Sequence, residues 1–141
     1  MIIKKPKDEK LIREAADISM DILFKLGQYI KAGIKTADID TLADDLCRKY
    51  HVKPAFKEVP NYYNATCISV NDEVLHGIPD QKNVLKAGDI VKIDFGIVYK
   101  GYYTDHCWTF AVESISKEDM KLLKASKEAT ENAVEKAISG N

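Results

Sequence analysis

The sequence has little cysteine and proline and lacks any long apolar run. Its 141 residues include three widely spaced cysteines and four prolines. An odd, scattered set of cysteines argues against a disulfide framework and favours a reducing, cytoplasmic setting. No stretch approaches the roughly 18 apolar residues of a membrane span. The basic residues near the start are followed by Asp8 and Glu9 and not by an apolar run, so we expect no secretory signal.

The sequence also lacks an excess of charge of either sign. Lysine and arginine number 21 and aspartate and glutamate 22, which gives a formal net charge of −1. This balance provides no electrostatic basis for binding nucleic acid, so we expect no DNA partner. The absence of a long apolar run gives no reason to expect a membrane partner either. The residues are 45% apolar and 30% charged, as in one globular domain.

Apolar periodicity predicts two helices in the first third of the chain. From about residue 7 to 32, apolar side chains recur in steps of three and four, and Gly33 would end this helix. Thr36 or Asp38 can cap a second helix. Residues 51–66 contain two prolines and two asparagines and are predicted to be a loop that leads into a short strand, CISV.

The rest of the chain is predicted to contain a long loop, two strands and a helix. The loop covers residues 71–89, and the strands meet around Lys100-Gly101. Ser116 begins a capping signal, Ser-Lys-Glu-Asp, for the last helix. The inner face of that helix is expected to comprise Leu122, Leu123, Ala129, Ala133, Val134 and Ala137.

The first and last helices are alike, since both are alanine-rich and end in glycine. One interpretation is a duplicated architecture whose second copy stops after its first helix. The alternative is that two helices of a common type merely resemble each other.

Two aspartates interrupt the otherwise apolar pair of strands. In the first strand, Val91, Ile93 and Phe95 form one face and Asp94 lies on the other. A connection of two or four residues places Asp94 and Asp105 on the same face, with Cβ atoms roughly 5–8 Å apart. Carboxylates at that spacing can bridge two divalent cations. A solvated face that tolerates the repulsion is the alternative, as is a three-residue connection that separates them.

Histidine and cysteine supply further candidates. His76 lies in a loop, where it can donate a hydrogen bond to a substrate or transfer protons, or be an ordinary surface residue. His51 is expected to be solvated. His106 should point away from the face of Asp105, and Cys107 toward it, either as a thiolate ligand or as a small packed side chain.

A small apolar pocket is a further possibility just before the strand CISV. The residues that can line it, or belong to the core, are Phe56, Tyr62, Tyr63 and Cys67.

The segments CISVNDEVLHGIP and LKAGDIVKIDFGIVYKGYYTD resemble methionine aminopeptidases of the bacterial, type I kind. The resemblance runs from about Lys7 to the last residue and depends most on HGIP and on two aspartates eleven residues apart. It implies an α+β, pita-bread fold of two pseudo-symmetric halves. Residues 1–141 would be the first half plus the first helix of the second, the N-terminal portion of a single, truncated peptidase catalytic domain.

The resemblance also implies a function. Such enzymes remove the N-terminal methionine from nascent proteins whose second residue is small, a step of protein maturation in the cytoplasm. The implied cofactors are two divalent ions (Co, Mn, Fe, Zn or Ni), with Asp94 as terminal ligand and Asp105 as bridging ligand. His76 would hydrogen-bond the scissile amide. Tyr62 and Cys67, and less directly Phe56 and Val59, would bind the methionine side chain. The implied partners are N-terminal methionine peptides and the ribosome.

Some positions depart from the family. His106-Cys107-Trp108 follows Asp105 where small or hydroxylated residues are usual, and Val59 stands where tyrosine is frequent, which affects pocket shape and substrate preference. The family's other three ligands come from its second half, so we expect the isolated chain to bind metal weakly and to be inactive. Three alternative hypotheses for the function are a binding module on the same scaffold, a prolidase-type hydrolase, and a purely structural hairpin with two solvated aspartates.

Overall fold

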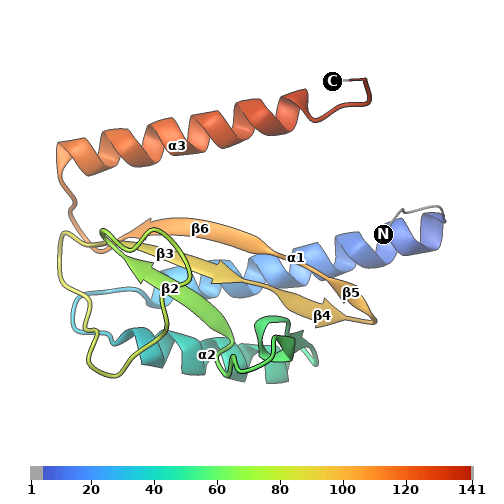
Figure 1. Cartoon of the computed structure of the whole chain (residues 1–141), viewed down its shortest axis with the longest axis horizontal. Helices are drawn as coiled ribbons and strands as arrows, with labels where there is room; N and C mark the ends of the chain where they lie inside the picture. The colour runs from blue at the N-terminus through green and yellow to red at the C-terminus, as the bar shows by residue number, and fades with distance from the viewer. Residues whose placement is uncertain (1–4, 141) are drawn as a thin grey trace.

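The structure is a computed structural model that describes residues 5–140. Lys4, one of the basic residues near the start, and Asn141, where the sequence stops, lie outside the described residues. The helices are α1 (Pro6–Tyr29), α2 (Thr36–Lys49) and α3 (Lys117–Lys136), with a 3₁₀ turn, η1 (Phe56–Glu58). The predicted α+β class is confirmed (Figure 1).

Two small antiparallel sheets are present in residues 5–140, in the orders β1-β4-β5 and β2-β3-β6. Residues 51–66, predicted as loop, therefore contain a short strand as well as η1. The strands are β1 (Lys53–Pro54), β2 (Thr66–Val70), β3 (Ile90–Phe95), β4 (Ile97–Tyr99), β5 (Tyr102–Tyr103) and β6 (His106–Ala111).

The N-cap of helix α2 lies one residue before Thr36, the first of its two predicted caps. Thr36 is the first helical residue and Lys35 is the N-cap, so neither predicted residue occupies the N-cap position, but the Asp38 side chain does cap the helix from its third residue. The Asp38 carboxylate accepts a hydrogen bond from Lys35 N at 3.4 Å. The Thr36 hydroxyl donates to Asp80 O at 3.1 Å, which ties the start of α2 to the long loop after β2.

The core lies between the helices and one face of the strands. Helices α1 and α2 pack beside each other under the sheets (Figure 1). Burying each large apolar side chain stabilises the fold by about 1.5–3 kcal/mol. Because side chains alternate along β3, Lys92 and Asp94 face away from this core. Its fully buried members include Ile22, Leu23, Leu26, Ile39, Val91, Ile93 and Phe95.

The hairpin has a two-residue turn, one of the two connection lengths predicted. Lys100 and Gly101 both have positive φ, 50° and 84°, and join the paired residues Tyr99 and Tyr102. The same register continues to the pair Asp94 and Cys107. Asp94 and Asp105 are therefore diagonal neighbours, as one of the two predicted arrangements required.

The predicted strands are interrupted at Gly96. A Cβ on this residue would lie 2.1 Å from Thr104 O. Only glycine therefore permits the close approach of the two backbone segments here. The interruption divides one long hairpin into β3 with β6 and β4 with β5.

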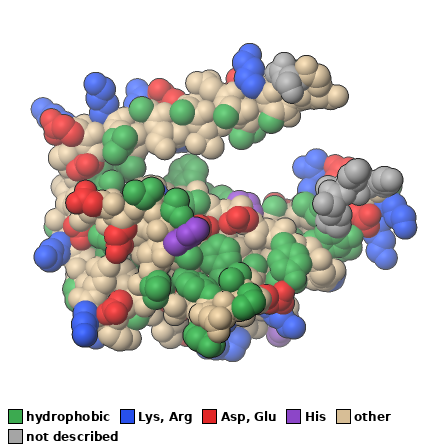
Figure 2. All heavy atoms as spheres, viewed as in Figure 1, with side chains coloured by type: hydrophobic (Ala, Val, Ile, Leu, Met, Phe, Trp, Pro, Cys, Tyr) green, Lys and Arg blue, Asp and Glu red, His purple; other side chains and the backbone are tan. Residues whose placement is uncertain are grey.

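Helix α3 begins as predicted, since Ser116 Oγ accepts a hydrogen bond from Asp119 N at 3.0 Å. Its predicted inner face was wrong, because none of its residues is buried and Val134 is 69% exposed. The helix stands away from the sheets over most of its length (Figures 1 and 2), and its contact with the sheet lies near its beginning, where Leu122 and Leu123 line a cavity with Thr109 of β6. In the part of the chain that the structure describes, no helix is long and apolar enough to cross a membrane.

Candidate metal centre

A cavity of about 470 Å³ lies on the sheet face that points away from α1 and α2. Figure 2 shows apolar side chains gathered with acidic and histidine side chains on one face of the molecule. The cavity contains all seven residues that the sequence analysis assigned to metal or substrate, together with Ile78. Its lining comprises Phe56, Val59, Tyr62, Cys67, His76, Ile78, Asp94 and Asp105.

The sheet places the two aspartates differently. Asp94 lies in the central strand β3, directly opposite Cys67 on β2 and Cys107 on β6. Its side chain is half-buried. Asp105 lies in the short connection between β5 and β6 and is exposed. Asp94 is thus held between two neighbouring strands, whereas Asp105 lies in the connection between the two sheets.

The environment of Asp94 is unfavourable for a charged carboxylate. Among the described residues, its buried Oδ1 has no hydrogen-bond partner. Burial, and then the nearby charge of Asp105, raise the pKa of Asp94 to about 6, although His76 and Lys92 act in the opposite direction. An unpartnered buried oxygen beside a second carboxylate would be stabilised by a cation placed between them.

The donors that converge on this cavity fit part of a metal site. Carboxylate oxygens suit hard and borderline divalent ions. Within residues 5–140, however, no group of three or more histidine, cysteine or acidic side chains is arranged to hold a metal ion. Burial raises the pKa of both Cys67 and Cys107, so both are thiols and not thiolates in the metal-free chain at neutral pH. Cys107 is exposed, so it is not a packed core residue either.

His76 reaches the cavity edge from a loop that lies against β2. Ile68 N donates to Gly77 O at 2.8 Å, and Gly77 N donates to Ser69 Oγ at 3.1 Å. A Cβ on Gly77 would lie 2.1 Å from Ile68 O, so the loop approaches the strand at a distance that only glycine allows. His76 itself is exposed and has a positive φ of 59°. Ile78 also lines the cavity and was not predicted to do so, although its position directly after His76-Gly77 was a usable signal.

The opposite wall of the cavity comes from η1 and the start of β2. Tyr62 donates a hydrogen bond from its hydroxyl to Thr66 O at 2.6 Å, and that hydroxyl lies 3.2 Å from Cys67 Sγ. Burial, first of all, raises the pKa of Tyr62, so it remains a neutral hydrogen-bonding group. Tyr63 was also a candidate for this pocket, but its side chain is 80% exposed and does not line it.

The other two histidines lie outside the cavity, as predicted. His106 Nδ1 is 3.1 Å from Ser19 Oγ of α1, on the face opposite Asp105. Burial lowers the pKa of His106. His51 is exposed after the end of α2.

Comparison with known proteins gives consistent relatives. The chain is 41% identical over all its 141 residues to the methionine aminopeptidase of Clostridium acetobutylicum, of which it covers 56%. A crystal structure of the methionine aminopeptidase from Thermotoga maritima superposes with a TM-score of 0.89 at 36% identity, covering 94% of this chain and 53% of that one. The prolidase of Pyrococcus horikoshii gives a TM-score of 0.81 at 26% identity, covering 94% of this chain and 37% of the prolidase.

The chain thus spans about half the length of the methionine aminopeptidases it matches. Similarity at the level of the family covers nearly all of the chain, because residues 10–141 match the sequence model of one metallopeptidase family. Together with the shared fold of its structural neighbours, this match assigns the chain to metallopeptidase family M24.

Proposed function

We propose that this chain is the N-terminal portion of a single M24-type catalytic domain, and that the whole protein removes the N-terminal methionine from proteins whose second residue is small. The observation that carries this proposal is the cavity, in which Asp94, Asp105 and His76 meet an apolar wall. The names of the relatives from Clostridium acetobutylicum and Thermotoga maritima support the same activity.

Membership of a metallopeptidase family implies a divalent metal cofactor. We propose that Asp94 and Asp105 supply carboxylate ligands to two such ions, and that further ligands come from outside the described residues. When bound, divalent ions polarise a carbonyl group and lower the pKa of water. A carboxylate-rich site suits Mn²⁺, Fe²⁺ or Co²⁺, and Zn²⁺ and Ni²⁺ also remain compatible.

The chain's own residues would bind and orient the peptide. The cavity wall formed by Phe56, Tyr62 and Cys67 is largely apolar, as binding of a flexible thioether side chain requires. His76 faces the same cavity from the opposite side. From there its ring nitrogen can donate a hydrogen bond to the amide that is cleaved. Val59, 54% exposed, would form the rim.

The proposed substrates are the N-terminal methionine peptides of nascent chains, which places the whole protein in the cytoplasm and near the ribosome. A prolidase activity is the nearest alternative, since a prolidase shares the fold. The apolar cavity favours methionine, because the side chain before the cleaved bond must be buried in it.

Methionine release from Met-Ala-Ser, with Mn²⁺ or Co²⁺ supplied, tests the proposal. We expect the full-length protein to release methionine and to lose the activity when a chelator removes the metal. An X-Pro dipeptide should remain uncleaved. Preferential cleavage of the X-Pro substrate would replace the proposal with a prolidase, and activity that survives metal removal would contradict it.

The 141-residue chain should release no methionine in the same assay. This expectation follows because two carboxylates cannot hold two hard cations that each need about six ligands. Clear release by the chain alone would contradict this expectation and would mean that a second copy of the chain, or Cys107 on the same face as Asp94, completes the centre.

A further inference from the structure

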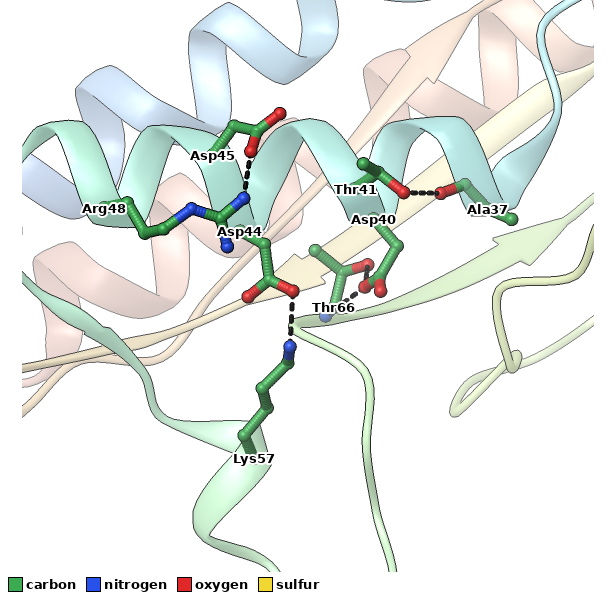
Figure 3. A network of polar contacts seen from close by, with 8 residues as sticks. All are labelled: Ala37, Asp40, Thr41, Asp44, Asp45, Arg48, Lys57 and Thr66. Carbon is green, nitrogen blue, oxygen red and sulfur yellow. Dashed lines mark hydrogen bonds and ion pairs between the residues drawn. The ribbon is translucent and has the colours of Figure 1, made fainter.

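The wall of the cavity is held from behind by helix α2. Residues 55–66 form this part of the wall and are called the wall segment. The segment begins and ends at the buried residues Ala55 and Thr66, and most of the residues between them are exposed. Figure 3 shows that two carboxylates of α2 point toward residues near the two ends of the wall segment. Asp40 and Asp44 are four residues apart, so they lie on the same face of the helix. Neither lines the cavity.

Asp40 contacts the end of the segment. Its Oδ1 accepts hydrogen bonds from Thr66 N at 2.8 Å and from Thr66 Oγ1 at 2.7 Å (Figure 3). Thr66 is completely buried and Asp40 is only 9% exposed. Thr66 O, on the other side of the same residue, accepts the hydrogen bond from the Tyr62 hydroxyl. A continuous set of hydrogen bonds therefore connects Asp40 to the cavity wall.

Asp44 contacts the beginning of the segment. Its carboxylate forms an ion pair with Lys57 of η1, between the wall residue Phe56 and Glu58 (Figure 3). This pair is partly exposed and therefore contributes little to stability. Asp40 is the stronger contact, because its two hydrogen bonds are buried.

The hydrogen bonds of Asp40 are poorly explained by stability alone. Burial raises the pKa of Asp40, and the charge of Asp44 acts in the same direction, while the bonds to Thr66 act against both. A buried charged group with few hydrogen-bond partners contributes little net stability compared with well-packed apolar side chains. The arrangement instead fixes the orientation of Thr66, because one carboxylate oxygen accepts hydrogen bonds from both its backbone and its side chain.

We propose that Asp40 is a positioning residue for the substrate cavity. Through Thr66 it fixes Tyr62 and Cys67, and thereby determines which side chain the cavity accepts. This inference depends on the proposed function, because the cavity is taken to bind the methionine side chain.

The test measures selectivity, which does not depend on how much of the protein is folded. For each full-length variant, kcat/KM is determined for Met-Ala-Ser and for Leu-Ala-Ser, and their ratio is compared with the wild-type ratio. Asp40→Ala should lower the ratio about tenfold, chiefly through a higher KM for the methionine peptide, because small displacements of binding groups cost large factors in rate. A purely structural role would lower the apparent kcat and leave the ratio unchanged.

Three further variants make the result specific. Thr66→Val, which keeps the backbone hydrogen bond and loses the hydroxyl, should lower the ratio about threefold. Thr66→Ser restores the hydroxyl and should give the wild-type ratio. Asp45→Ala breaks the exposed ion pair with Arg48 on the same helix and should not change the ratio (Figure 3).

Wild-type ratios in both Asp40→Ala and Thr66→Val would overturn the proposal. If Asp40→Ala does not fold, Thr66→Val decides alone. A wild-type protein that releases no methionine would refute the proposed function itself, a result distinct from an active enzyme whose selectivity ignores Asp40.

Discussion

Replacing Asp94 by asparagine should stabilise the metal-free 141-residue chain at neutral pH. The pKa of Asp94 rises from 3.8 to about 6 in the folded chain because the carboxylate is half-buried and lies near Asp105. Between these two values the folded state keeps a proton that the unfolded state has released. The stability associated with protonated Asp94 is therefore complete below about pH 4 and is lost as the pH rises through about 6. Asparagine cannot ionise and avoids this loss.

The magnitude follows from the same shift. Two pKa units correspond to about 3 kcal/mol, at 1.36 kcal/mol for each unit. Partial exposure and solvent screening reduce the expected gain to about 1–2 kcal/mol. For a domain of this length, that gain should raise the melting temperature by about 3–6 °C. At pH 4.5 the advantage should fall to about a third of its value at pH 7.5, because the folded carboxyl is then protonated.

Thermal unfolding followed by circular dichroism, with a chelator present, measures both effects. Asp105→Asn provides the matched comparison. It removes the neighbouring charge but leaves Asp94 buried, so its stabilisation should be smaller. The reasoning is refuted if Asp94→Asn melts below the wild type at pH 7.5, or if its advantage is equal at the two pH values.

The remaining predictions concern the full-length protein. His76→Ala should lower kcat on the order of 100-fold and leave the metal content unchanged, since it removes only a hydrogen-bond donor; unchanged methionine release would contradict this role. Asp105→Ala should abolish metal binding and activity together, and a variant that kept a tenth of the wild-type rate would count against it as a ligand. Gly77→Ala should destabilise by about 1–3 kcal/mol, because the added Cβ would lie 2.1 Å from Ile68 O. Urea unfolding beside the exposed control Gln81→Ala measures this, and equal midpoints would contradict the close approach.

The sequence predicts the parts of this fold that depend on local periodicity. The spacing of apolar residues located α1 and α2, and the alternation in β3 separated Asp94 from the buried Val91, Ile93 and Phe95. The turn at Lys100-Gly101 gave the register, because its length determines which residues are opposite. For the same reason, the sequence predicted that the two aspartates share one face, as opposite or diagonal neighbours, and the observed register shows that they are diagonal.

Features that depend on contacts distant in sequence were not predicted. The inner face of α3 was wrong because amphipathic periodicity indicates an apolar stripe but not whether anything covers it. The break at Gly96 arises from its approach to Thr104 O, eight residues along the chain. The support of Thr66 by Asp40 joins residues 26 apart, and no pattern in either segment indicates it.

The break at Gly96 also explains why two identical side chains have different environments. If the hairpin were continuous, Asp105 would lie within a strand opposite Gly96 and would be fixed as firmly as Asp94. The interruption leaves Thr104 and Asp105 outside the strands, between β5 and β6. Asp94 is therefore held half-buried in the row formed by Cys67 and Cys107, whereas Asp105 is exposed at the joint and faces the same cavity. This difference is consistent with the proposed roles, in which Asp94 would be a terminal ligand fixed by the sheet and Asp105 would be the more accessible, bridging ligand.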